Sequence, residues 1–371
     1  MMLKKTELYD KHKSNGARLV EFGGWEMPVQ YSGIQKEHLN VRSQAGLFDI
    51  SHMGQVLCHG KQSEAFLNYC FTNNVTKLSP GEGQYTLLCH SERDGGTVDD
   101  LYLFKLSADS FLIIFNASRF ETDLEFLHRY LSVADFDEKQ VTIKNLSLEH
   151  SALALQGPKS EGIVDKVFGS KPSSLEKNQI IALEYSESEI KISRTGYTGE
   201  DGFEIMGSHQ IILSIWDALL ENGQEFGLCP VGLGARDSLR LEAGFPLFGH
   251  ELNMSILPVE AGLMWAVDTQ KNDFAGKSKI LQKMDQNQLN RLIGLEMVDK
   301  APPPRQGYPV WNAENEKSPV GTITSGGLSP SLKNGIALAY VPKELSKKHR
   351  SWWIEIRGKK YLARQHKKSF I

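Results

Sequence analysis

Cysteine is scarce in this sequence and is scattered along it. The 371 residues include only four cysteines, and no two of them form a CxxC pair. This pattern excludes a standard thiolate metal site and gives no disulfide framework. The simplest compartment for such a chain is a reducing one, so we expect a cytoplasmic protein without a bound metal. The four are Cys58, Cys70, Cys89 and Cys229.

Long hydrophobic runs and an excess of one charge are also missing. No stretch approaches the roughly 18 consecutive apolar residues of a membrane span, and polar residues, not the apolar core of a signal peptide, follow Met1–Thr6. Lysine plus arginine number 42 against 45 for aspartate plus glutamate, a net charge of −3, whereas dedicated nucleic-acid binders carry a basic excess. We therefore expect neither a membrane nor a nucleic acid as a partner.

Several common catalytic and nucleotide-binding motifs are absent or incomplete. Gly276-Lys277-Ser278 matches the end of a phosphate-binding loop, but Lys271 stands where that loop needs a glycine. There is no GxSxG elbow and no HExxH motif. His52 has no second histidine at ligand spacing, and we expect a structural role for it.

Length and composition indicate a globular protein of two or three domains. A hydrophobic fraction of 40% with 23% charged residues is ordinary for a folded chain. The composition changes near residue 275, and Ala301–Pro304 forms a rigid connector. Beyond it, short strands such as Trp352–Arg357 alternate with turns. We predict domains at residues 1–275 and 285–371, the second a small all-β barrel or sandwich.

Periodicity predicts several elements of the first domain. Lys36–Ala45 has the pattern of a helix that Gly46 ends, and Leu47–Gly54 that of a strand ending in a polar turn. Apolar residues spaced by four, three and four along Phe120–Leu131 predict a further helix. Short helices and strands thus alternate throughout this domain.

The stretch Gly95–Leu101 places two adjacent carboxylates at the start of a predicted strand. Neighbouring side chains of a strand point to opposite faces, so Asp100, unlike Asp99, falls in the more apolar, aromatic row. A carboxylate in such a row has a partner or a chemical role, although two aspartates that merely begin a strand are the simpler interpretation of this stretch alone. The hairpin formed with Phe111–Phe115 should present Asn116 near its end.

Two further stretches combine groups that suit ligand binding. Gly196–Glu204 holds three glycines, a tyrosine and three carboxylates in nine positions. Glycines at this density let backbone approach a ligand, Tyr197 offers a flat apolar face with a polar tip, and Glu204 is suited to accept two N–H donors from a planar heterocycle. A decorated hairpin turn explains the same pattern equally well. Ala235–Gly244 carries arginines and carboxylates at helical spacing, either as intrahelical pairs or to hold an anionic ligand.

Together these blocks resemble one known family, the aminomethyltransferases, or T proteins, of the glycine cleavage system. The resemblance runs through nearly the whole chain, and so many ordered blocks exclude chance agreement. The blocks are Phe22–Tyr31, Phe48–Gly54, Gly95–Leu101, Leu155–Pro158, Gly196–Glu204, Ala235–Gly244, Thr324–Gly327 and Ser329-Pro330.

The resemblance implies an α+β fold of three lobes around a central folate cavity. Two antiparallel-sheet α+β lobes occupy residues 1–275, and a C-terminal β-barrel occupies residues 285–371. The implied reaction takes an aminomethyl group from the dihydrolipoyl arm of the lipoylated H protein and passes its carbon to the co-substrate tetrahydrofolate. Ammonia leaves, and the reduced arm is returned. Glycine decarboxylase and dihydrolipoyl dehydrogenase are the implied functional partners in glycine catabolism.

Site roles follow from the same resemblance, residue by residue. Asp100 matches the family's catalytic aspartate, which suits a step that frees an amine nucleophile of its proton and stabilises a developing cation. Glu204 matches the pterin-binding glutamate, Tyr197 the aromatic residue beside it and Arg236 an arginine that holds folate. The other positions that line the implied cavity are Met53, Tyr85 and Asn116. Asp99 is expected to order the turn at the start of its strand.

The C-terminus departs from the family pattern. Members usually end in a Pro-Phe segment followed by tyrosine or basic residues that reach the ligand, whereas this chain ends in Lys368–Ile371 without that proline or tyrosine. Arg364 or Lys367 are the candidates to replace that contribution, and we assign Arg364 to folate binding.

Two other functions share the implied fold. Folate-binding scaffolds of iron–sulfur assembly or tRNA modification carry a cysteine-containing glycine motif, but here Arg194–Tyr197 contains no cysteine and Asp100 is retained. The folate-handling half of a dimethylglycine or sarcosine oxidase would follow a flavin-binding half, yet the match is already under way at Phe22. The sequence therefore favours the aminomethyltransferase.

Overall fold

A computed structural model describes residues 3–92, 94–134, 136–284 and 289–371. The chain divides into two compact units: unit 1 comprises residues 1–86 and 100–236, and unit 2 comprises residues 87–99 and 237–371. Each unit is described by itself. The predicted domains at 1–275 and 285–371 stay a prediction, and the polar segment 282–290 between them lies partly outside the described residues. No helix in the described part is long and apolar enough to cross a membrane.

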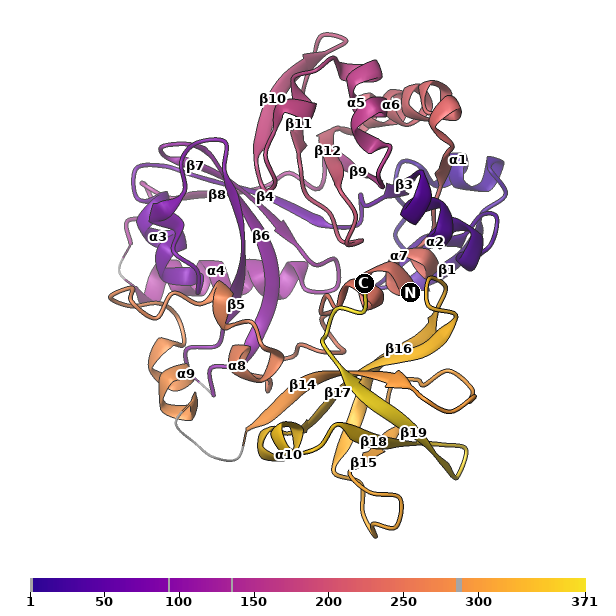
Figure 1. Ribbon diagram of the computed structural model, residues 1–371. Helices are drawn as coiled ribbons and strands as arrows, with labels where there is room; N and C mark the ends of the chain where they lie inside the picture. Colours follow the sequence, from indigo (N-terminus) through magenta and orange to yellow (C-terminus); the bar gives the residue numbers. More distant parts are fainter. Residues whose placement is uncertain (1–2, 93, 135, 285–288) are drawn as a thin grey trace. The chain divides into compact units, whose positions relative to one another are not determined.

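The first sheet of unit 1 has five strands in the order β5-β6-β7-β4-β8 (Figure 1). Helices α3 and α4 cover one of its faces. Lys105 of β6 pairs with Glu64 of α3, and Phe115 of β7 packs on Phe120 of α4. The elements are β4 (Gly54–His59), β5 (Gly83–Cys89), β6 (Thr97–Ser107), β7 (Ser110–Phe115), β8 (Thr142–Asn145), α3 (Ser63–Cys70) and α4 (Phe120–Val133).

The second sheet of unit 1 has six strands in the order β10-β11-β12-β9-β3-β13. Helices α5 and α6 lie over one face (Figure 1), where Leu153, Ile205 and Trp216 belong to one buried cluster. The sequence predicted antiparallel sheets, but the edge strand β13 runs parallel to β3. The elements are β3 (Ala45–Asp49), β9 (His150–Gln156), β10 (Ile180–Tyr185), β11 (Ser188–Ser193), β12 (Gly202–Ser208), β13 (Leu228–Pro230), α5 (Ser160–Phe168) and α6 (His209–Asn222).

The N-terminal region adds α1 (Tyr9–Ser14), the β1–β2 hairpin (Arg18–Phe22 and Trp25–Gln30) and α2 (Ile34–Ser43). The predicted helix over 36–45 is thus present but ends earlier, at Ser43. Gly46 does not end it and lies in β3, where an added Cβ would stand 2.5 Å from Val41 and 2.6 Å from Val231. Close packing, not helix termination, requires this glycine.

Unit 2 contains the barrel that the sequence predicted from residue 285 onward. Six strands close in the order β14-β17-β16-β15-β18-β19. Trp352, Ile354 and Ile356 of β18 alternate into its buried core. The strands are β14 (Asn290–Met297), β15 (Pro309–Trp311), β16 (Gly321–Ser329), β17 (Asn334–Pro342), β18 (Ser351–Ile356) and β19 (Lys359–His366). The helices are α8 (Pro258–Ala261), α9 (Lys277–Met284) and α10 (Lys343–Lys348), while α7 (Leu233–Ala243) begins in unit 1.

Candidate functional site

Asp100 lies in β6 with both carboxylate oxygens held by hydrogen bonds. The phenol of Tyr85 in β5 donates to Oδ2 at 2.9 Å. The amide of Asn116, which directly follows β7, donates to Oδ1 at 3.1 Å and to the backbone carbonyl of Asp100 at 2.9 Å. The β6–β7 hairpin therefore delivers Asn116 where the sequence predicted. Donors of this kind favour the ionised form of a carboxyl group.

The two faces of β6 differ in burial. The face with the more apolar residues is the less buried of the two. Leu101, Leu103 and Lys105 are buried on the face that α3 and α4 cover, and Asp99 is fully buried. On the other face, Asp100 and Tyr102 are half-buried. Val98 and Phe104 of this row are fully buried, so the more apolar row is the more accessible one only at Asp100, Tyr102 and Leu106. An aromatic row left partly open suits a ligand surface.

The glycine-rich loop between β11 and β12 encloses a side chain of the protein. Gln156, at the end of β9, donates from Nε2 to the carbonyl of Thr195 at 3.1 Å, and its Oε1 accepts from the Thr198 hydroxyl at 2.9 Å. An added Cβ would stand 1.9 Å from Oε1 at Gly196 and 2.5 Å from Nε2 at Gly202. The Gln156 side chain leaves no room for a Cβ at these two positions, which is why both are glycine. No sequence pattern predicted this role for Gln156.

Two ion pairs fix the same loop and use two of its three carboxylates. Arg194 binds Asp201 through Nε at 3.0 Å and Nη2 at 2.5 Å. Arg42 donates to Glu200 at 2.9 Å and to the carbonyl of Thr198 at 2.7 Å. The carboxylates of Asp201 and Glu200 thus hold the loop in place. Glu204 is the carboxylate of this stretch that pairs with neither of these two arginines.

Glu204 is half-buried in β12 and has one hydrogen bond, from the Thr195 hydroxyl to Oε2 at 2.5 Å. Its Oε1 accepts none from the described residues. Burial raises the pKa of Glu204 above its ordinary value, while the Thr195 hydrogen bond and the charge of Arg236 oppose that rise. Burial also raises the pKa of Tyr102, and the negative charge of Glu204 raises it further. Glu204 therefore lies near the open aromatic face that holds Asp100.

Arg236 in α7 stacks its guanidinium on Tyr197, with 4.8 Å from Cζ to the ring centre. Its Nη1 is buried and has no hydrogen-bond partner among the described residues. Burial lowers the pKa of Arg236, although the charge of Glu204 acts to raise it. A buried guanidinium with a free donor is costly unless something binds it. An acceptor group on a ligand would satisfy it.

The start of α7 is fixed by the buried carboxylate of Glu37. One oxygen accepts the backbone N–H of Gly232 at 2.9 Å. The other accepts three successive backbone N–H groups, at 2.6, 2.7 and 3.0 Å, from Tyr31, Ser32 and Gly33. Glu37 thereby positions the turn that leads to Arg236. The sequence carries no pattern that singles out this glutamate.

His52 and Met53 lie in the turn between β3 and β4, which is the polar turn that the sequence predicted at the end of the strand over 47–54. Burial, and then the charge of Arg236, lower the pKa of His52 to about 4, so its ring is neutral at physiological pH. The ring packs edge-on against Phe22, 5.8 Å between centres. Met53 directly precedes Gly54, whose strand partner is Phe115. Met53 therefore lies at the same end of the sheet as Asn116.

The buried Asp49 anchors this turn. One oxygen accepts the backbone N–H of Ser51 at 2.9 Å. The other lies 2.9 Å from Nε2 of the buried His12, whose Nδ1 lies 2.8 Å from the Tyr31 hydroxyl. The side chains of Asp49, His12 and Tyr31 thus bind one another, and we assign them a positioning role.

Two further arginines, Arg240 and Arg364, belong to unit 2. Arg240 is 1% exposed in unit 2 and pairs with Asp237 at 2.7 Å and Glu251 at 2.9 Å. The arginines of α7 therefore divide into one with a structural pair and one with a free donor. Arg364 is exposed on barrel strand β19, opposite Glu296 of β14. Its assignment to folate binding stays a prediction.

The arrangement combines two carboxyl groups with a guanidinium. The described residues contain no group of three or more histidines, cysteines or acids that could hold a metal ion. What they do contain is an oriented carboxylate at Asp100, a second at Glu204 with a raised pKa and a stacked guanidinium at Arg236. Such a set can bind a planar polar molecule and move a proton beside it.

Two family models match the chain. The GCVT N-terminal domain covers residues 8–271, and the glycine cleavage T-protein C-terminal barrel domain covers residues 290–371. The aminomethyltransferase of Geobacillus sp. (strain WCH70) is 43% identical over 373 residues, with 98% of this chain and 97% of that protein covered. The aminomethyltransferase of Bacillus subtilis (strain 168) is 42% identical over 371 residues, with 100% and 99% covered.

A solved structure is similar over the same length. The glycine cleavage system aminomethyltransferase T from Bartonella henselae matches with a TM-score of 0.89 and 33% identity, covering 100% of this chain and 98% of that one. Sequence and fold thus agree from end to end.

Proposed function

The chain belongs to the glycine cleavage T-protein family and is an aminomethyltransferase, and on this premise we propose its substrates and the roles of its residues. The donor is the lipoylated H protein that carries an aminomethyl group on its dihydrolipoyl arm. The acceptor is tetrahydrofolate, in line with a family that is folate-dependent in general. Glycine decarboxylase and dihydrolipoyl dehydrogenase supply and reoxidise that arm. The four free cysteine thiols suit a reducing cytoplasm.

The site residues fit tetrahydrofolate as a co-substrate. Glu204 has an oxygen that no described residue uses, and adjacent N–H donors of a pterin would give it two charge-assisted hydrogen bonds. Arg236 has a buried Nη1 that needs an acceptor. Tyr197 and Tyr102 offer half-buried ring surface for a flat heterocycle. We assign Met53 to the cavity wall on its place beside Asn116.

Asp100 is the proposed catalytic residue. The carbon of the aminomethyl group leaves the arm's sulfur and its own nitrogen and forms bonds to two folate nitrogens. The two N–H protons that these nitrogens lose end on the thiol and on the departing ammonia, so that atoms and charge balance. Asp100, fixed by Tyr85 and Asn116, takes a proton from the nucleophilic nitrogen and stabilises the positive charge that develops at the carbon.

One observation carries this proposal: a carboxylate with both oxygens oriented lies on an open aromatic face, with Glu204 and Arg236 close to that face. The test is ammonia release from aminomethylated H protein, with and without tetrahydrofolate. A large acceleration by tetrahydrofolate is expected. Folate binding without acceleration would instead support a folate-binding scaffold, and the same assay therefore separates the two functions.

A further inference from the structure

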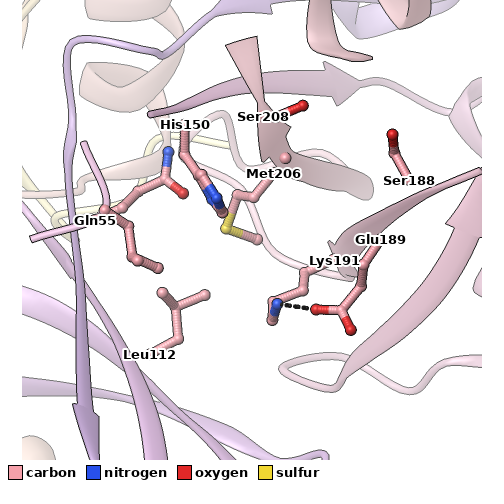
Figure 2. Close-up of a pocket in the computed structure, with 10 residues that line it drawn as sticks. Gln55, Leu112, His150, Ser188, Glu189, Lys191, Met206 and Ser208 are labelled. Atoms are coloured by element: carbon pink, nitrogen blue, oxygen red, sulfur yellow. Dashed lines mark hydrogen bonds and ion pairs between the residues drawn. The ribbon is translucent and has the colours of Figure 1, made fainter. Parts of the chain in front are cut away.

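A cavity of about 290 Å³ lies between the two sheets of unit 1 (Figure 2), and its lining includes none of the residues assigned to the reaction. Strands β4 and β7 form one wall, and β9, β11 and β12 form the other. We call it the Gln55 cavity. Its lining residues are Gln55, Leu112, Leu146, His150, Ser188, Glu189, Lys191, Met206, Gly207 and Ser208.

Gln55 is the unusual member of this lining. It is 1% exposed, and neither Nε2 nor Oε1 of its side chain has a hydrogen-bond partner among the residues that the structure describes. Its backbone is paired, because its N–H donates to the Ser147 hydroxyl at 2.8 Å. A buried amide without partners costs stability that an apolar side chain of the same size would not cost. The unpaired donor and acceptor of Gln55 therefore lower the stability of the free protein.

Other polar groups around the cavity are also unused. The side chains of His150, Ser188 and Ser208 make no hydrogen bond to any residue that the structure describes. Figure 2 shows the His150 side chain beside the amide of Gln55 and Lys191 across the cavity. Burial, and then the charge of Lys191, lower the pKa of His150. Its neutral ring adds one donor or acceptor without adding charge.

Charge and apolar surface complete the lining. Lys191 is 21% exposed and pairs with the more exposed Glu189 at 2.5 Å. An exposed partner of this kind is readily exchanged for an anionic group on a ligand. Leu112, Leu146 and Met206 are buried and supply the apolar part. The cavity therefore offers one cation, one neutral donor–acceptor pair and an apolar floor.

The Gln55 cavity is distinct from the proposed folate site. Gln55 pairs with Ile114, and Ile114 pairs with Tyr102. Cross-strand partners share a face, so Gln55, Ile114 and Tyr102 form one row on the face that also holds Asp100, which lies two residues from Tyr102 along β6. Neither Asp100 nor Glu204 lines the cavity.

We propose that the Gln55 cavity is a second ligand site, for a small organic monoanion that carries a cis-amide or equivalent donor–acceptor pair. The anion contacts Lys191 in place of Glu189. The Gln55 side chain, whose two polar atoms each have less than 1 Å² of accessible surface in the free protein, turns into the cavity to pair with the amide of the ligand, and the carbon skeleton of the ligand packs on Leu112 and Met206. The site does not depend on the proposed roles of Asp100 or Glu204.

The probe is 5-oxoproline, which joins a carboxylate to a cis-lactam in a ring small enough for the cavity. Two relatives each lack one feature: cyclopentanecarboxylate has no lactam, and 2-pyrrolidinone has no carboxylate. Protein with ¹³C-methyl-labelled methionine has nine such residues, and Met206→Leu assigns the signal of Met206. We expect 5-oxoproline to shift that signal with a dissociation constant on the order of 1 mM, and each relative to bind at least about tenfold more weakly.

Two variants test the contacts, each with a matched control. Gln55→Met should weaken the binding of 5-oxoproline by about tenfold or more. It should also raise the melting temperature of the free protein, because the unpaired amide is removed. Lys191→Met should weaken the binding of 5-oxoproline similarly. Gln224→Met and Lys166→Met, at exposed positions of the same unit, should change neither.

Three results would overturn the proposal. One is no saturable shift of the Met206 signal with 5-oxoproline at ten times the expected dissociation constant. Another is equal binding of all three compounds. The third is a lower melting temperature for Gln55→Met, because the amide would then already be satisfied in the free protein.

Discussion

Asn116 holds Asp100 at two points, donating 3.1 Å to Oδ1 and 2.9 Å to the backbone carbonyl. Since one amide binds both the side chain and the backbone of the same residue, it fixes the direction of the carboxylate relative to its strand. Tyr85 holds the remaining oxygen. A general base must be held in a fixed orientation to take a proton from a bound amine, and hydrogen bonds to both carboxylate oxygens provide that orientation.

Tyr85→Phe should move the pH dependence of the reaction. The lost hydrogen bond favours the ionised form of a carboxylate, so the acidic limb of kcat/KM for ammonia release should shift to higher pH. Tyr185→Phe, a half-buried tyrosine of the same unit, serves as the control. An unchanged acidic limb in Tyr85→Phe would contradict a role for this hydrogen bond.

Glu204→Ala should weaken tetrahydrofolate binding by about 2–4 kcal/mol, because two charge-assisted hydrogen bonds are lost. Isothermal titration calorimetry measures this directly. An unchanged dissociation constant would mean that the pterin binds elsewhere.

Glu204→Gln should make the free protein more stable than wild type as the pH rises. The pKa of Glu204 is raised by burial, so the folded state binds its proton more tightly than the unfolded state. Its contribution to stability is present at low pH and is lost as pH rises through the folded pKa. The glutamine variant should therefore gain unfolding free energy relative to wild type from acidic to neutral pH in urea titrations. A constant difference across that range would contradict the raised pKa.

The two arginines of α7 should separate stability from binding. Arg240→Met removes one partner of a buried pair with Glu251 and should cost about 3–5 kcal/mol of unfolding free energy. Arg236→Met removes a buried charge that has a free Nη1, and should instead weaken tetrahydrofolate binding with little loss of stability. Urea unfolding and calorimetry on both variants give the comparison. Equal effects of the two on either quantity would contradict this division.

Those arginines show where sequence reasoning stopped. Helical spacing placed Arg236 and Arg240 on one helix, but intrahelical pairs and a ligand site remained equally possible. The choice depends on Glu251, eleven residues further along, which spacing within the helix does not reveal. Only the folded chain brings Glu251 to Arg240.

Alternation along β6 was more informative, yet incomplete. Period two correctly put Asp100 and Tyr102 on one face and Leu101 and Leu103 on the other. It did not show which face is covered, because that depends on where α3 and α4 pack. The strand β13 was missed since three residues ending in Pro230 carry too little pattern. Glu37 acts through backbone N–H groups, and Gln156 acts through a backbone carbonyl and the Thr198 hydroxyl, contacts that leave no trace in composition.

His52 should make the protein less stable in acid. Its pKa falls from the ordinary 6.5 to about 4 in the folded state, so the unfolded state gains a proton first as pH drops. Stability should be fully present above about pH 6.5 and fall by about 3 kcal/mol as pH approaches 4. His52→Asn should remove this part of the pH dependence in urea titrations at several pH values, whereas the exposed His59→Asn should retain it. An identical slope in both variants would contradict a neutral, buried His52.

The most direct test of the account is Asp100→Asn, measured for ammonia release from aminomethylated H protein with and without tetrahydrofolate. The amide keeps the shape of the carboxylate but cannot take a proton, so tetrahydrofolate should bind within about threefold of wild type. The tetrahydrofolate-dependent rate should fall by about 10²–10⁴-fold. Full tetrahydrofolate-dependent activity in this variant would remove Asp100 from the mechanism.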